Sequence, residues 1–244
     1  MAEVRIERLS WPEVEAALAA GKRTAIVCAA ASEQHGPHLP EATDALLGEV
    51  IAVRLAEELG DALVAPVIRP ACSDHHMAFP GTITISADLL TALLDAYLES
   101  LGRHGFRRFV VFSSHGGNFP VLADWAHRRP RPDVIVLSDI EGFLEAMREG
   151  MRKHGRDDDY GVHADLMETS EMLAVHPELV HMERAAPGYT KPMVLQDVLD
   201  RGMRAISASG VLGNPVGATA EMGESVLERL VGHLAARVRQ AGIS

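Results

Sequence analysis

The sequence has few of the features that mark secreted or membrane proteins. It contains only two cysteines among 244 residues, so at most one disulfide is available, and we expect both thiols to be reduced. The longest apolar run, Ala25–Ala31, is far shorter than the roughly 20 residues of a membrane-spanning helix. The N-terminal residues are charged and do not resemble a secretion signal. These absences predict a cytoplasmic protein.

The chain also has few positive charges, because its 23 basic residues are outnumbered by 34 acidic residues and the net charge is −11. Such a balance repels the phosphates of nucleic acids and the headgroups of anionic lipids. We therefore expect no nucleic-acid or membrane partner. The chain is 47% hydrophobic with a mean hydropathy of +0.04, enough for a large core. No repeat, Gly/Ser linker or charge block divides it, so residues 1–244 are predicted to form a single domain.

Short apolar runs alternate with amphipathic segments along the chain. Continuous runs rich in Val and Ile are typical of parallel strands that helices cover on both faces. The predicted strands are Arg23–Ala30, Ala62–Ile68, Phe106–Ser113 and Asp133–Ser138. The predicted helices are Leu46–Leu59, Ala87–His104, Pro120–His127, Ile140–His154 and Ala218–Ala241. This order predicts an α/β fold with βαβ units, and the polar segment Gly155–Tyr160 is interpreted as a surface loop.

Polar side chains of unusual chemistry follow the first predicted strand. Open α/β sheets bind ligands beyond the carboxyl ends of their strands. Because residues i and i+2 of an extended segment point the same way, Glu33 and His35 can form a chelating pair. Asp44 follows a turn rich in Gly and Pro and can bridge two cations, and this mixed N and O set suits zinc, manganese or iron. The alternative is that these are ordinary loop residues that bond turn amides.

A second histidine, His115, follows the third predicted strand and precedes Gly116 and Gly117. Glycines allow the backbone to approach a ligand, so their amides can face developing negative charge. The HGG element is also typical of serine esterases, but these require a G-x-S-x-G turn that the chain does not contain. Later, His163 lies at the start of a predicted helix that carries Glu168 about one and a half turns further on. On spacing alone, Glu168 could be a solvated carboxylate.

Together these motifs resemble the creatininase (creatinine amidohydrolase) family over most of the chain. The matching segments, in the order of the family, are Glu33–Asp44 (EQHGPHLPEATD), Phe79–Ser86 (FPGTITIS), Ser113–Asn118 (SSHGGN), His163–Ser170 (HADLMETS) and Gly210–Glu224 (GVLGNPVGATAEMGE). The resemblance implies a three-layer αβα sandwich with a mostly parallel sheet and a two-metal centre. It also implies hydrolysis of cyclic or small amides by a homo-oligomer, often a hexamer.

The resemblance further assigns roles to individual residues. The family's metal-ligand positions fall on Glu33, His35, Asp44, His115 and Glu168, with Asp44 as the bridge. His163 matches a histidine of proton transfer or substrate binding, and the amides of Gly116 and Gly117 are expected to hold the oxyanion. Substrate binding is expected at His76 and Asn118.

Three positions depart from the family pattern. Creatininase has a metal-binding glutamate two residues beyond the strand-end histidine, where this chain has Gly117. Its aromatic wall for creatinine is largely tryptophan, and neither Trp11 nor Trp125 is a clear counterpart. Asp165 replaces a glycine of many relatives, and we interpret it as a favourable charge at a helix N-terminus.

The sequence therefore predicts an enzyme that uses two divalent metal ions (Zn, Mn or Fe) to hydrolyse a cyclic amide or another small C–N substrate, and not creatinine itself. One alternative is a hydrolase that opens a keto-sugar or keto-cyclitol ring at a C–C bond. Another is a noncatalytic, metal-stabilised subunit of an oligomer. The proximity of Cys72 to His75 and His76 offers a cysteine hydrolase as a weaker hypothesis.

Overall fold

The computed structural model describes residues 2–156, 163–191 and 195–242. Four parallel strands form one sheet in the order β2-β1-β3-β4. The strands are β1 (Thr24–Ala29), β2 (Ala62–Val64), β3 (Arg108–Ser113) and β4 (Val134–Leu137). The predicted parallel sheet is thereby confirmed.

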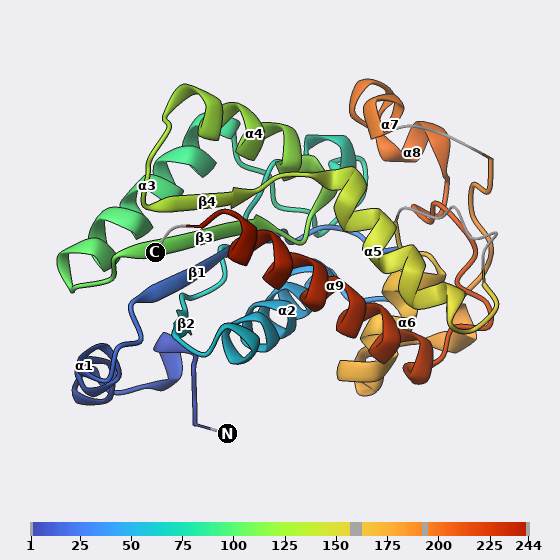
Figure 1. Cartoon of the computed structure of the whole chain (residues 1–244). Coiled ribbons are helices and arrows are strands. Elements are labelled where there is room, and N and C mark those ends of the chain that lie inside the picture. Colours follow the sequence, from blue (N-terminus) through green and yellow to red (C-terminus); the bar gives the residue numbers. More distant parts are fainter. Residues whose placement is uncertain (1, 157–162, 192–194, 243–244) are drawn as a thin grey trace.

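Helices cover both faces of this sheet (Figure 1). On one face lie α2 (Thr43–Leu59) and α9 (Ala220–Gln240), with α5 (Ile140–Arg152) packed against α9. On the other face lie α3 (Ala87–Arg103) and α4 (Phe119–Arg128). Each of α2, α3 and α4 connects two successive strands, which confirms the βαβ pattern and the αβα layers.

The two central strands determine where a ligand site can form. Every residue of β1 is buried, as its uninterrupted apolar sequence predicts for a strand covered on both faces. β1 pairs with β3 over its whole length, and Ala29 stands opposite Ser113 at the carboxyl ends. The loops that leave these two strands therefore start side by side, beneath α6 (Leu166–Val175).

Strand β2 is shorter than the sequence predicted, and Pro66 explains the difference. Proline has no N–H to donate to a sheet ladder. Regular pairing stops at Val64, although the N–H of Ile68 still donates to the carbonyl of Cys28 at 3.0 Å. The chain thus stays next to β1 and enters the segment that carries Cys72 and the histidines after it.

Three helices were not anticipated from the sequence: α1 (Trp11–Ala19), α7 (Leu195–Arg201) and α8 (Met203–Ile206). Helix α1 had a readable signal, because Ser10 and Glu13 form a capping box and Pro12 lies in the first turn. The short helices α7 and α8 lie beyond the carboxyl ends of the strands (Figure 1).

Helix α9 buries its apolar face inside the chain. The buried side chains are Val226, Leu227, Leu230, Val231, Leu234 and Val238. They pack in the main core, and α9 contacts α2, α5, α6 and β4. Packing within one chain therefore accounts for this face without a second subunit.

Two further sequence predictions concern cysteines and loops. Both cysteines are free thiols, as expected. Residues 157–160 of the predicted loop lie outside the described residues. No helix in the described parts of the chain has the length and apolar character needed to cross a membrane.

Candidate active site

The loop after β1 and the start of α2 bring three predicted ligands together. Glu33, His35 and Asp44 are all buried, with 1%, 0% and 3% of their surface exposed. His35 Nε2 lies 3.1 Å from Asp44 Oδ1, because Asp44 occupies the first turn of α2 and faces back toward the loop. Glu33 and His35 offer ligand atoms within 4.8 Å of each other, as a chelating pair requires, and their role as ligands stays a prediction.

His115 reaches the same point from the end of β3. Its Nδ1 lies 3.2 Å from Glu33 Oε1 and 3.3 Å from Asp44 Oδ2. Ser113 holds this turn, because its hydroxyl donates to the carbonyl of Ala29 at 2.7 Å and accepts from the N–H of His115 at 3.0 Å. The register of β1 and β3 thus positions the two halves of the site.

Backbone carbonyls determine which nitrogen of each imidazole faces the carboxylates. A carbonyl can only accept a hydrogen bond, so the ring nitrogen beside it must donate. His35 donates from Nδ1 to the carbonyl of Glu33 at 3.0 Å, and His115 donates from Nε2 to the carbonyl of Cys72 at 3.2 Å. The opposite nitrogen of each ring therefore points at Glu33 or Asp44. Metal-binding histidines commonly have this arrangement.

The buried carboxylates of this cluster need compensating positive charge. Although burial opposes it, the Asp44 carboxylate raises the pKa of His35 to about 10, and Glu33 raises the pKa of His115 well above its usual value. Glu33 Oε2 and Asp44 Oδ2 are buried and accept no hydrogen bond from the described residues. Two buried carboxylates with spare oxygens can be balanced by protons on the histidines or by metal ions. The donor set fits divalent cations.

Helix α6 supplies Glu168 from the opposite side. Ala164, just before the helix, has a positive φ of 50°, and its N–H donates to the Glu168 carboxylate. Asp165 is the N-cap and accepts from the N–H groups of Met167 and Glu168, which confirms the interpretation of Asp165 as a helix N-terminal charge. The Glu168 carboxylate lies 3.9 Å from His35 Nε2. Burial raises the pKa of Glu168 to about 7.

His163 lies above the pair of carboxylates in a neutral form. Its Nε2 donates to the carbonyl of Gln34 at 2.8 Å, so Nδ1 keeps a free lone pair, 4.0 Å from Glu33 Oε1. Burial and the nearby charge of His35 lower the pKa of His163 to about 3. The ring is therefore neutral near pH 7, with Nδ1 as its unprotonated nitrogen.

His76 and Gln34 hold the Glu33 carboxylate in place. Gln34 accepts from the N–H of Gly36 through Oε1, so its amide nitrogen is the donor that reaches His76 Nδ1 at 2.9 Å. His76 must then carry its proton on Nε2, which lies 3.2 Å from Glu33 Oε1. His76 also lines the cavity, so its predicted contact with substrate stays open as a prediction.

The glycines and Asn118 form a short 3₁₀ turn, Gly116–Asn118, directly after His115. Gly116 and Gly117 line the cavity, where their predicted oxyanion role would require them. Asn118 is fully buried, and its amide donates to the carbonyls of Ala29 and Ala30 and accepts from the N–H of Cys72. It ties three segments together, and its contact with substrate stays a prediction without support from this arrangement.

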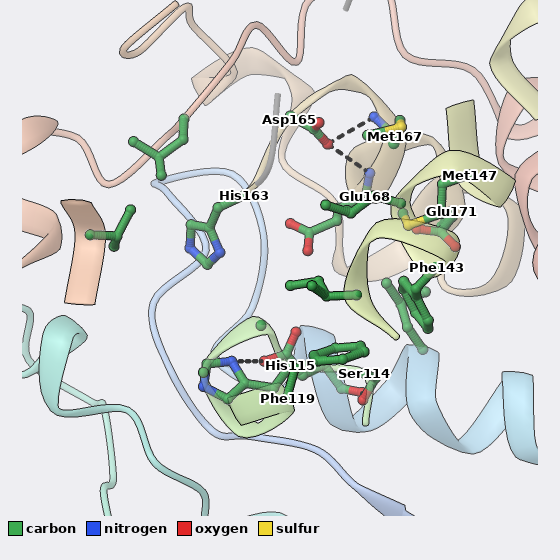
Figure 2. A pocket seen from close by; sticks show the side chains of 18 of the residues that line it. Ser114, His115, Phe119, Phe143, Met147, His163, Asp165, Met167, Glu168 and Glu171 are labelled. Atoms are coloured by element: carbon green, nitrogen blue, oxygen red, sulfur yellow. Dashed lines mark hydrogen bonds and ion pairs between the residues drawn. The ribbon is translucent and has the colours of Figure 1, made fainter. Parts of the chain in front are cut away.

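These side chains open into a cavity of about 370 Å³. Figure 2 shows Phe143, Met147 and Glu171 on one wall, across from His163. Glu171 is 2% exposed, and its Oε1 accepts no hydrogen bond from the described residues. Its pKa is raised well above the usual value by burial and by the charges of Glu168 and Asp165.

We expect Glu171→Gln to stabilise the metal-free protein at pH 8 by on the order of 1 kcal/mol, the usual size of a single-substitution effect, because burial raises the pKa of Glu171 and makes its charged form unfavourable. A carboxyl whose pKa is higher in the folded state contributes its full stability below the unfolded pKa and loses it as the pH rises. The variant and the wild type should therefore have similar stability near pH 5 and differ increasingly toward pH 8 in urea unfolding. Exposed Glu15→Gln is the control and should change little. An unchanged pH dependence in Glu171→Gln would contradict the prediction.

The cysteine hydrolase hypothesis is not favoured by this geometry. Burial raises the pKa of Cys72, whereas a nucleophilic cysteine needs a lowered pKa and a histidine that accepts its proton. It is the backbone carbonyl of Cys72 that contacts His115.

Sequence reasoning did not identify Gln34 or Glu171 as site residues, and it did not place His75 beside His115. Gln34 and His75 each stand next to predicted site residues, and Glu171 follows Glu168 by three positions, which is one helix turn. Proximity to predicted ligands was therefore the available signal. It could not show which neighbours turn inward.

Comparisons with known proteins show that the chain is similar to hydrolases. The sequence model of the creatininase family, described as creatinine amidohydrolase, matches residues 7–238. The chain is 32% identical over 225 residues to mycofactocin precursor peptide peptidase of Mycolicibacterium smegmatis, covering 88% of this chain and 84% of that protein. It is 31% identical to creatinine amidohydrolase of Pseudomonas putida, with 97% and 96% covered.

A more distant relative has a different name. The chain is 23% identical to 3-dehydro-scyllo-inosose hydrolase of Thermotoga maritima, covering 88% of this chain and 76% of that protein. Among solved structures, the one named "Creatininase Mn" superposes with a TM-score of 0.79 at 29% identity, with 98% of both chains covered.

Proposed function

Because this chain belongs to the creatininase family of hydrolases, we propose that it is a two-metal amidohydrolase that cleaves a C–N bond of a small amide. The observation that carries this proposal is the position of Asp44. Its Oδ1 faces His35 Nε2 at 3.1 Å, and its Oδ2 faces His115 Nδ1 at 3.3 Å. One carboxylate therefore connects two sets of ligand atoms, as a bridge between two cations requires.

The described residues divide into two such sets. Glu33 and His115 form one set near Asp44, and His35 and Glu168 form the other, while Glu33 also offers a ligand atom within 4.8 Å of His35. Divalent cations held by these sets would polarise a carbonyl and activate a water molecule. Zinc, manganese and iron all suit mixed nitrogen and oxygen ligands.

The remaining residues would handle protons and charge. His163 offers a neutral Nδ1 beside Glu33 and can accept a proton there and return it to the departing nitrogen. The amides of Gly116 and Gly117 stand at the cavity wall, where they would face the oxyanion. Apolar side chains such as Phe143 and Met147 would exclude water around the reacting bond.

The cavity does not favour creatinine as the substrate. No tryptophan is among its lining residues in the described parts of the chain. Trp11 is 77% exposed on α1, and Trp125 is buried on α4, where its indole donates to Asp95 at 3.2 Å. The walls are instead aliphatic and phenylalanine side chains with buried Glu171, so we propose a cyclic amide or another small amide of different shape.

Metal analysis followed by a substrate screen tests this function. Protein purified without added metal should contain about two divalent ions per chain, and chelation should abolish turnover. With metal restored, lactams, formamides and short peptides should include at least one substrate that releases a free amine or a new amino group. A metal content near zero after equilibration with zinc, manganese and iron would refute the two-metal centre.

A second function is favoured by the relative named 3-dehydro-scyllo-inosose hydrolase. The same site could open a keto-cyclitol or keto-sugar ring at a C–C bond, with His163 delivering a proton to carbon. Turnover of keto-cyclitols with no release of amine from any amide would establish this alternative. Full metal content with no activity on either class would favour a noncatalytic subunit.

We also propose that the chain forms a single domain, that it is cytoplasmic and that it assembles into a homo-oligomer. The family resemblance implies that this oligomer is a hexamer. Met77 and Ile83, on either side of the Phe79 segment, are 51% and 57% exposed, which is compatible with a subunit border there. Light scattering would compare the particle mass with the 26.3 kDa of one chain.

A further inference from the structure

His75 has no assigned role in the chemistry above, yet it lies against the metal ligands. It belongs to the 3₁₀ turn Asp74–His76 and is 9% exposed. Its ring stacks on the ring of His115, with centroids 5.6 Å apart and an interplanar angle of 14°. The turn therefore presents two histidines to the site, His76 toward Glu33 and His75 alongside His115.

The ring nitrogens of His75 have no other partner. No hydrogen bond joins either of them to the part of the chain that the structure describes, whereas His35, His115 and His163 each donate to a backbone carbonyl. Glu33, His75 and His115 each offer a ligand atom, and these atoms lie within 4.8 Å of one another. His75 thus directs a free donor atom at the cation position between Glu33 and His115.

Gly117 explains why the imidazole can occupy this place. A Cβ atom on Gly117 would lie 2.8 Å from His75 Cε1, 2.6 Å from the carbonyl oxygen of Cys72 and 2.5 Å from His115 Nε2. A side chain at position 117 would therefore compete for space with the rings of His75 and His115, and glycine leaves that space to them.

We propose that His75 is a further metal ligand at the cation position formed by Glu33, Asp44 and His115. The inference rests on the proposed two-metal function and adds a ligand to it. A neutral imidazole from His75 gives that position two nitrogen donors, His75 and His115, without adding negative charge. Nitrogen-rich sites select zinc over manganese more strongly than carboxylate-rich sites do. The two cation positions should thus differ in preference, with zinc favoured at the His75 side.

The decisive measurement is metal content after equilibration in buffered zinc. We expect His75→Ala to fall from about two to about one zinc per chain, with zinc affinity at the lost position reduced at least about 10²-fold. His75→Glu should restore two ions and shift the preference of that position toward manganese. The control His104→Ala removes an exposed histidine at the end of α3 and should retain both ions.

Folding is separated from ligation by melting each variant without and with zinc. Apo His75→Ala should melt like the apo wild type, while the rise in melting temperature on adding zinc should be smaller. If His75→Ala is misfolded, His75→Gln serves as the second variant with the same expectation. Two zinc ions bound to His75→Ala with wild-type affinity would overturn the ligand assignment and leave the two-metal function intact. Fewer than two ions in the wild type would refute the function itself.

Discussion

Replacing Asp44 with alanine should release both metal ions and lower turnover by about 10³–10⁴-fold or more, because metal assistance contributes several kcal/mol to the transition state. The two oxygens of Asp44 face different rings, Oδ1 toward His35 at 3.1 Å and Oδ2 toward His115 at 3.3 Å. Glu33 also offers a ligand atom within 4.8 Å of each ring, but the Asp44 carboxylate turns one oxygen to each of them. Metal analysis and turnover measured on the same sample would check the prediction.

The control for Asp44→Ala must remove a similar charge from a similar place. Asp88 lies in the first turn of α3, as Asp44 lies in the first turn of α2, but Asp88 is exposed and far from the ligands. Asp88→Ala should lose only the favourable charge at a helix N-terminus, about 0.3–1 kcal/mol of stability. Full metal content in Asp44→Ala would show that Asp44 is not a bridge. Loss of one ion only would assign it to a single position.

The sequence predicted the two halves of this site because they follow central parallel strands. Burial on both faces gives β1 and β3 their continuous apolar runs, and the carboxyl ends of neighbouring parallel strands meet at one edge of the sheet. Glu33, His35 and His115 were therefore expected near one another before any coordinates were considered. Their identification as ligands required the family resemblance, since loop carboxylates and imidazoles have many other uses.

The positions that the sequence could not predict lie where backbone direction is set by tertiary contacts. Pro66 ends the ladder of β2, and from there only packing guides the chain toward His75 and His76. Whether a loop histidine faces inward depends on its neighbours in space, and no periodic pattern reports it. In the same way, no pattern reported that the amide of Asn118 bonds three backbone groups, and its contact with substrate stays a prediction.

His163 raises the sharpest question about the site, because its surroundings allow two roles. Its nitrogen belongs to a possible ligand group with Glu33 and His35, yet its Nδ1 stands 4.0 Å from Glu33 Oε1, compared with 3.2 Å for His115. The bond from Nε2 to the carbonyl of Gln34 fixes the tautomer that leaves Nδ1 ready to accept a proton. The longer distance and the free lone pair favour proton transfer.

We therefore expect His163→Ala to retain both metal ions while kcat falls by roughly 10²–10⁴-fold, the usual contribution of a positioned acid or base. The matched control is His38→Ala, because His38 is also buried and burial lowers its pKa to about 4, but its ring bonds Thr169 at 2.9 Å. That variant should lose stability and keep kcat for the folded fraction. Loss of one ion from His163→Ala would make His163 a ligand.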